Sequence, residues 1–126
     1  MSFDWNEYLI LAERLAAGDE ASKRTAISRA YYCIFNLAYA RAQTTAGAYP
    51  GGEPTHKWCW TKYQQTPDVS CQNLGTCGLR MKRRREQADY KAVSYPRLDD
   101  EVRRTLQEAR QFQRDLAALN ATYPRP

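Results

Sequence analysis

The sequence predicts an all-α protein, an up-and-down bundle of four or five helices. Apolar residues recur at three- and four-residue spacing along most of the chain, which is typical of helices that bury one face. No segment alternates apolar and polar residues as a half-buried strand would, and no internal repeat is present. The length of 126 residues, with 43% hydrophobic and 26% charged residues, predicts one domain over residues 1–126 and excludes a multidomain enzyme.

The first two segments carry the clearest helical patterns. An apolar stripe runs through residues 4–17, with Asp4 as a suitable N-cap and Gly18 as a stop. The next helix is expected at about 21–44, with Ser22 as its cap. Its middle reads SRAYYCIFN and is apolar on most faces, which is typical of a helix at the centre of a bundle.

The second half of the chain alternates between loops and helices. Three glycines and two prolines predict a loop at about 45–54, and a short helix follows at 55–65. One proline and two glycines predict a second loop or a frayed helix start at about 66–78. Two more helices are expected at about 79–92 and 98–120, separated by a Tyr-Pro break.

Composition indicates a cytoplasmic protein that does not enter a membrane. No run approaches the roughly 18 apolar residues of a membrane helix. The N-terminus carries Asp4 and Glu7 where a signal peptide would carry basic residues. Four cysteines are too few for a disulfide scaffold at this length, so reduced thiols are expected.

The positive charge is concentrated in one segment. Residues 55–91 contain eight basic and three acidic residues, an excess of five that equals the net charge of the whole chain. A neutral scaffold with one basic segment favours a polyanionic partner, of which RNA is the commonest in the cytosol. A solvated charged helix face is the alternative. The candidate RNA- or nucleotide-binding residues are Lys57, Arg80, Lys82, Arg83, Arg84 and Arg85.

One arginine lies in the most apolar helix and needs a partner. Burying an unpaired charge costs several kcal/mol, so Arg29 is a candidate site residue, and Asn36 lies two turns further on nearly the same face. Asp89 follows Arg85 at the i,i+4 spacing of a helical ion pair, so one carboxylate is expected to serve both arginines. Alternatively, Arg29 forms a purely structural salt bridge to a carboxylate of another helix.

The helix that carries Arg85 supplies further expectations. Its apolar stripe predicts that Arg85 faces inward while Arg83 and Arg84 point outward. The hydroxyl of Tyr90 is a candidate hydrogen-bond partner for the arginine and carboxylate network. The whole network can also be structural, fixing the register of the helices.

The single histidine has three interpretations. His56 begins a short helix and is a candidate proton-transfer group if the fold places it near Arg29, or else a capping residue without chemistry. The third interpretation is zinc, because the spacing H-x2-C-x11-C-x5-C offers four ligands: His56, Cys59, Cys71 and Cys77. No cofactor or metal is part of the leading interpretation.

Three motifs in this order resemble those of HEPN domains. They are SRAYYCIFN in a central helix, Thr55-His56-Lys57 after a loop, and Arg85 with Ala88, Asp89 and Tyr90 in a later helix. HEPN domains are short helical bundles of many prokaryotic toxin, defence and nucleotidyltransferase-linked proteins. The resemblance covers residues 4–119 and implies a homodimer, whose partners include RNA or a nucleotide and a cognate antitoxin or nucleotidyltransferase.

The resemblance also implies metal-independent ribonuclease activity, by attack of a ribose 2′-hydroxyl on the adjacent phosphate. Active members carry an arginine followed after four to six residues by a histidine, and this chain has Asn36 at that place. An amide cannot exchange protons near neutral pH, so Asn36 can orient or bind a phosphate only. The expected function is RNA or nucleotide binding in a toxin-antitoxin or defence setting. The alternative is a catalytically inactive interaction module that docks a partner protein.

Overall fold

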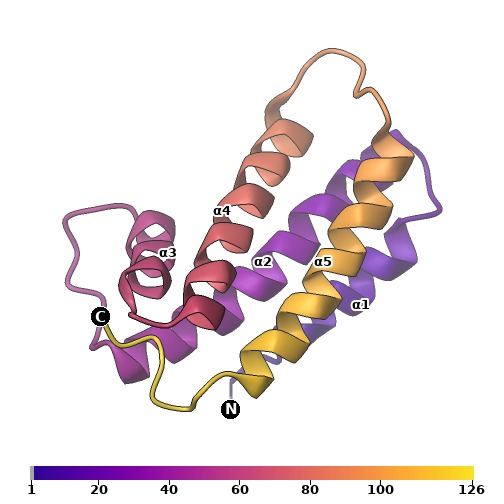
Figure 1. Ribbon diagram of the computed structural model, residues 1–126. Coiled ribbons are helices and arrows are strands. Elements are labelled where there is room, and N and C mark those ends of the chain that lie inside the picture. Colours follow the sequence, from indigo (N-terminus) through magenta and orange to yellow (C-terminus); the bar gives the residue numbers. More distant parts are fainter. Residues whose placement is uncertain (1) are drawn as a thin grey trace.

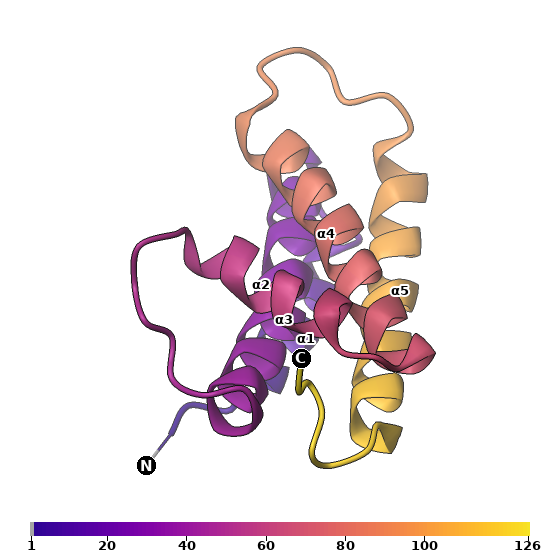
Figure 2. The same ribbon diagram turned by 60° about the vertical axis from the view of Figure 1, so that its left-hand side comes forward.

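Residues 2–126 are described by a computed structural model of five helices, four of which pack around the fifth (Figure 1). No strand occurs in this range, so the predicted all-α bundle is confirmed. The helices α1, α2, α4 and α5 alternate in direction, and α3 lies beside the first half of α4 (Figure 2). The helices are α1 (Asn6–Leu15), α2 (Glu20–Thr45), α3 (Thr55–Gln65), α4 (Val69–Tyr90) and α5 (Leu98–Ala118).

The central element is α2, as its apolar composition predicts. It contacts each of the other four helices. Its buried alanines, among them Ala30, Ala38 and Ala42, allow these neighbours to approach its backbone closely. Its larger side chains, such as Tyr31 and Ile34, fill the spaces between the neighbours. The position of α2 therefore sets the relative placement of all other helices.

Aspartates cap two helices, and in the first of them the aspartate replaces the expected residue. The carboxylate of Asp19 accepts a hydrogen bond from the backbone N–H of Ser22 at 2.9 Å, so Asp19 is the cap of α2 and the expected cap, Ser22, lies in the first turn. Asp68 caps α4 in the same way through the N–H of Cys71 at 2.9 Å. The helix at 55–65 has the predicted bounds, although its N-cap is Pro54 and no side chain caps it.

Of the two alternatives predicted for 66–78, a loop or a frayed helix start, the loop is wrong beyond residue 68, because α4 begins at Val69. The two glycines that suggested a loop lie inside the helix, where both are buried against α3. An added Cβ at Gly75 would lie 3.0 Å from the carbonyl oxygen of Trp60, and one at Gly78 would lie 2.5 Å from three atoms of the Trp60 indole. These glycines therefore provide space for close helix packing and do not end the helix.

Two arginines of α2 cap the C-terminal ends of the neighbouring helices. The guanidinium of Arg24 donates to the carbonyl oxygens of Ala88, Lys91 and Val93, at the end of α4. Arg41 donates to four carbonyl oxygens at the end of α5 and beyond, those of Leu116, Leu119, Asn120 and Tyr123. A cation at this end of a helix satisfies free carbonyl groups and interacts favourably with the helix dipole.

Candidate functional site

Two guanidinium groups lie within cation–π distance of one tyrosine ring on α2. The Cζ atom of Arg29 is 5.1 Å from the ring centre of Tyr32, and that of Arg85, from α4, is 5.4 Å from it. Arg29 also lies 4.9 Å from the ring of Tyr8 on α1, and Arg85 lies 5.7 Å from the ring of Tyr31. Three helices thus bring two arginines and three tyrosines to one place.

Asp89 is the carboxylate of this cluster. It pairs with Arg85 at 3.5 Å, as the i,i+4 spacing predicts, and accepts a hydrogen bond from the Ser28 hydroxyl at 3.2 Å. Arg29 reaches it only indirectly, because its Nη2 lies 3.5 Å from the same hydroxyl. The expectation that one carboxylate pairs with both arginines is therefore wrong. Within residues 2–126 Arg29 also lacks the alternative salt bridge to another helix.

The cluster has one cation more than its anions balance. Lys82 pairs with Glu86 at 2.6 Å and Arg85 with Asp89, which leaves Arg29 without a carboxylate in the described part of the chain. The Nε atoms of Arg29 and Arg85 are buried and have no hydrogen-bond partner there. A partly buried cation without a carboxylate partner is costly, and an anion bound to the accessible part of the Arg29 guanidinium would reduce that cost.

His56 joins this cluster from the first turn of α3. Its ring stacks on that of Phe35, with centres 3.8 Å apart and planes 9° apart, and its Nδ1 lies 2.6 Å from the Tyr31 hydroxyl. Burial, with smaller contributions from Arg85 and Lys82, lowers the pKa of His56 to about 4. The fold therefore brings His56 to the arginine site in its neutral form.

Asn36 lies on the same face of α2 but does not contact Arg29. Its side-chain N–H₂ donates to the backbone carbonyl of Tyr32 at 2.8 Å, one turn earlier in the helix. Two turns separate it from Arg29, about 10 Å along the helix axis. The amide oxygen of Asn36 therefore remains available as an acceptor, and Tyr32 lies between the two residues in the sequence.

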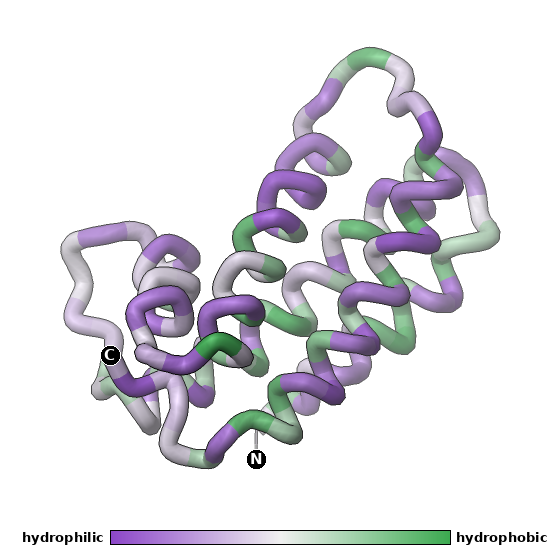
Figure 3. The backbone as a smooth tube through the Cα atoms, in the orientation of Figure 1, coloured by the Kyte–Doolittle hydropathy of each residue, from purple (hydrophilic) through white to green (hydrophobic). Residues whose placement is uncertain are grey.

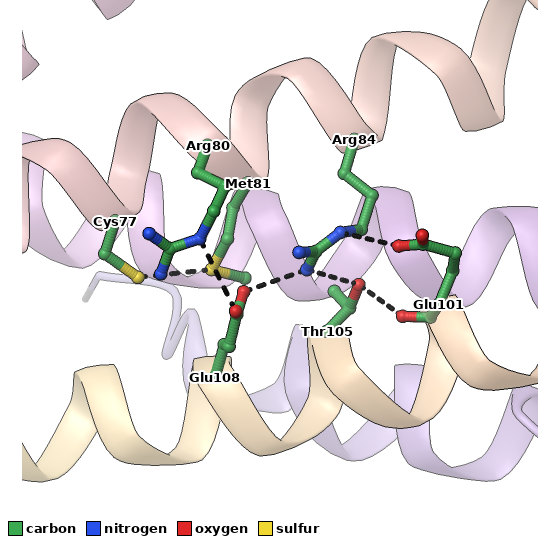
Figure 4. Close-up of polar contacts among 7 residues, drawn as sticks. All are labelled: Cys77, Arg80, Met81, Arg84, Glu101, Thr105 and Glu108. Atoms are coloured by element: carbon green, nitrogen blue, oxygen red, sulfur yellow. Dashed lines mark hydrogen bonds and ion pairs between the residues drawn. The ribbon is translucent and has the colours of Figure 1, made fainter.

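The basic run of α4 is divided between two faces. Arg84 is only 9% exposed and pairs with Glu101 and Glu108 of α5, each at 2.9 Å, while Arg80 lies 3.5 Å from Glu108 (Figure 4). The expectation that Arg84 points outward is therefore wrong. Arg83 is exposed as predicted. The second half of α4 is largely hydrophilic (Figure 3), although Arg84 and Arg85 are both buried.

Two other candidates lie outside the cluster. Tyr90 is 76% exposed, and among residues 2–126 its hydroxyl has no hydrogen bond to either arginine or to Asp89. The expected role of Tyr90 in the network is therefore wrong. Lys57 is exposed in the first turn of α3, next to His56 in the sequence, and its predicted role in binding stays a prediction.

The four zinc-ligand candidates are not brought together. No group of three or more potential metal-ligating side chains forms anywhere in the described residues. Cys59 is fully buried and its thiol has a raised pKa, while the Nδ1 of His56 already has Tyr31 as its partner. All four cysteines are free thiols. None of the five helices, within residues 2–126, has the length and hydropathy needed to cross a membrane.

Sequence reasoning overlooked the tyrosines of this site. The sequence predicted no site role for Tyr8, Tyr31 or Tyr32, yet they provide the ring contacts and the hydroxyl that hold Arg29, Arg85 and His56. The available signal was a pair of adjacent tyrosines two positions after an arginine. On a helix, adjacent residues point in different directions, so one ring can face the core and the next the surface.

The low pKa of His56 makes folding sensitive to mild acid. Between pH 6.5 and 4 the unfolded chain binds a proton at this residue and the folded chain does not. This contribution to stability is complete above about pH 6.5 and is lost as the pH falls toward 4. Because part of the ring faces solvent, we expect a loss of about 1–2 kcal/mol in the free energy of unfolding.

Urea unfolding at pH 7 and pH 4.5 measures this effect. His56→Gln has no titrating ring, so its free energy of unfolding should fall less than that of the wild type over the same interval. An equal fall in both proteins would show that the acid sensitivity arises elsewhere, for example in the carboxylates.

No family model, no curated protein and no solved structure matches the chain. The interpretation of the site therefore rests on its own chemistry. That chemistry comprises one unbalanced arginine, a second buried arginine, a neutral imidazole and several aromatic rings.

Proposed function

We propose that the chain is a HEPN-like protein that binds the phosphate backbone of single-stranded RNA at the Arg29 cluster. The observation that carries the proposal is the guanidinium of Arg29, which is partly buried between two tyrosine contacts and has no carboxylate partner in residues 2–126. A guanidinium matches the geometry of a phosphate, and charge-assisted hydrogen bonds to it are strong.

Aromatic rings beside the arginines favour RNA over a simple anion. Tyr8 and Tyr32 are both partly exposed and lie next to Arg29. Unpaired bases stack on such rings, and this is a common mode of single-strand recognition. Lys57, Lys82 and Arg83 add positive charge on α3 and α4, the segment that carries the whole net charge of the chain.

The chemistry of the cluster supports binding more strongly than cleavage. Transfer of the 2′-hydroxyl proton needs a group that exchanges protons near neutral pH. Asn36 cannot do so, and the pKa of His56 is lowered to about 4 while its Nδ1 is already hydrogen-bonded. Binding without cleavage is therefore the expected activity of the purified protein.

Loss of Arg29 should weaken RNA binding at least about tenfold, because one charge-assisted contact contributes about 1.5–3 kcal/mol. Fluorescence anisotropy with a labelled single-stranded RNA, at two salt concentrations, compares the wild type with Arg29→Ala. The salt dependence of the variant should also be weaker by about one phosphate contact. Arg104→Ala is the control, since it removes an equal charge from an exposed position on α5.

Two results would contradict the proposal. The first is equal RNA affinity of Arg29→Ala and Arg104→Ala, which would show that RNA binding depends on the overall charge of the protein and not on the Arg29 cluster. The second is loss of stability in Arg29→Ala, measured by circular dichroism, with no RNA binding by the wild type. That outcome would favour the interaction module, in which the cluster is structural. Incubation of the same RNA in EDTA tests directly for metal-independent cleavage.

A further inference from the structure

A chain of hydrogen bonds runs from the core to the only histidine of the protein. The indole Nε1 of Trp60 lies 3.1 Å from the hydroxyl oxygen of Tyr31, and that oxygen lies 2.6 Å from Nδ1 of His56. Trp60 and Tyr31 are fully buried, so this chain is anchored in the core. It ends at the cluster that contains Arg85 and Lys82.

The donors and acceptors of this chain favour one position for the proton of the imidazole. An indole N–H can only donate, so the Tyr31 oxygen accepts from Trp60. The hydroxyl proton of Tyr31 is then free to be donated, and Nδ1 of His56 is the acceptor within reach. An accepting Nδ1 places the proton of the neutral ring on Nε2.

The surroundings of His56 keep the ring neutral. Burial is the largest factor that disfavours a positive charge on it, Arg85 and Lys82 of α4 add to this effect, and Glu86 acts in the opposite direction. Tyr31 and Tyr32 of α2 also face the ring. Lys57 is its exposed neighbour on α3. Nε2 has no hydrogen-bond partner in residues 2–126. It is not among the buried polar atoms that lack a partner, so it is accessible to solvent.

We propose that Tyr31 is a positioning residue, which fixes His56 as a neutral Nε2–H donor that binds a phosphate oxygen of the ligand and transfers no proton. The donor lies in the field of Arg85 and Lys82, whose own carboxylate partners are Asp89 and Glu86, so a neutral N–H here can bind a phosphate oxygen without adding a further charge to the site. This inference rests on the proposed function, because it names how one residue of that site meets RNA. It replaces the interpretation of His56 as a proton-transfer group.

The imidazole can be observed directly, since the chain has one histidine. Long-range ¹H–¹⁵N spectra of labelled protein distinguish the two neutral tautomers. The wild type should show the Nε2–H form from pH 5 to 8. Tyr31→Phe keeps the ring but removes the hydroxyl, so it should give a mixture of tautomers and a pKa closer to the ordinary value.

Tyr63→Phe is the matched control for this experiment. It also removes the hydroxyl of a buried tyrosine, whose bond goes to the carbonyl of Ala38 at 2.8 Å and not to His56. Its spectrum should keep the wild-type tautomer. An Nδ1–H form in the wild type, or an unchanged tautomer in Tyr31→Phe, would overturn the inference.

Addition of a short single-stranded RNA tests recognition separately. The ¹⁵N signal of Nε2 should shift as RNA saturates the wild type, and Tyr31→Phe should bind the RNA at least threefold more weakly than Tyr63→Phe. RNA binding without a shift of Nε2, and with equal affinity of the two variants, would overturn the inference while the proposed function stands. Absence of RNA binding by the wild type would overturn both the proposed function and the recognition of phosphate by His56.

Discussion

Replacing Gly78 with alanine is expected to lower the free energy of unfolding by about 2 kcal/mol, although alanine is the better helix former. In an open helix the change from glycine to alanine is favourable by about 1 kcal/mol. Here the new Cβ would lie 2.5 Å from three atoms of the Trp60 indole, which is fully buried. Forcing an extra methyl group into a packed core costs about 1–3 kcal/mol or more, and a rigid ring has little freedom to move away.

Urea unfolding followed by circular dichroism tests this expectation. Thr76→Ala introduces an alanine at an exposed position of the same helix, where it meets no clash, and should be neutral or slightly stabilising. A double-mutant cycle with Trp60→Leu should show strong coupling, because the smaller side chain removes the ring that the methyl group meets. If Gly78→Ala were as stable as the wild type, α3 and α4 would not approach each other as closely as the structure has them.

The same substitution should also disturb the candidate site. Any displacement of Trp60 acts on the Tyr31 hydroxyl that it contacts, and through it on His56. The tautomer of His56 in Gly78→Ala therefore reports how tightly the packing of α3 on α4 is coupled to the cluster.

The helices were predictable where one face of the chain is apolar. Both α1 and α5 show this stripe, and their bounds differ from the prediction by two residues or fewer. The start of α4 was not predictable in this way. Gly75 and Gly78 are the usual signals of a loop, and only the large ring of Trp60 on another helix explains why they occur in one.

The site was predictable only where its contacts are local. The pair of Arg85 and Asp89 is four residues apart on one helix, and its spacing alone predicts it. The contact of Tyr31 with His56 joins residues 25 positions apart and depends on how α3 returns to α2 after the loop at 46–54. No local sequence pattern encodes such a contact. Tyr31 lies in an apolar run, so the sequence does not indicate a polar role for its hydroxyl.

Arg84→Ala is expected to destabilise the fold by about 3 kcal/mol. Arg84 is 9% exposed and holds Glu101 and Glu108 of α5, with Nη1 also donating to Thr105 at 3.0 Å (Figure 4). Removing one partner of a buried ion pair typically costs about 3–5 kcal/mol, because the remaining charges stay desolvated. The glutamates are partly exposed, at 28% and 22%, which places the expected cost at the lower end.

Arg80→Ala is the matched control, because Arg80 lies one turn earlier and contacts Glu108 as well. It is half exposed and its contact is longer, at 3.5 Å, so its loss should cost about 0.5 kcal/mol or less. The same urea titration separates the two variants. Equal stability of Arg84→Ala and Arg80→Ala would mean that water reaches the contact between α4 and α5. A large difference would show that two arginines of one basic run have different roles, because Arg84 joins α4 to α5 while Arg80 contributes little to stability.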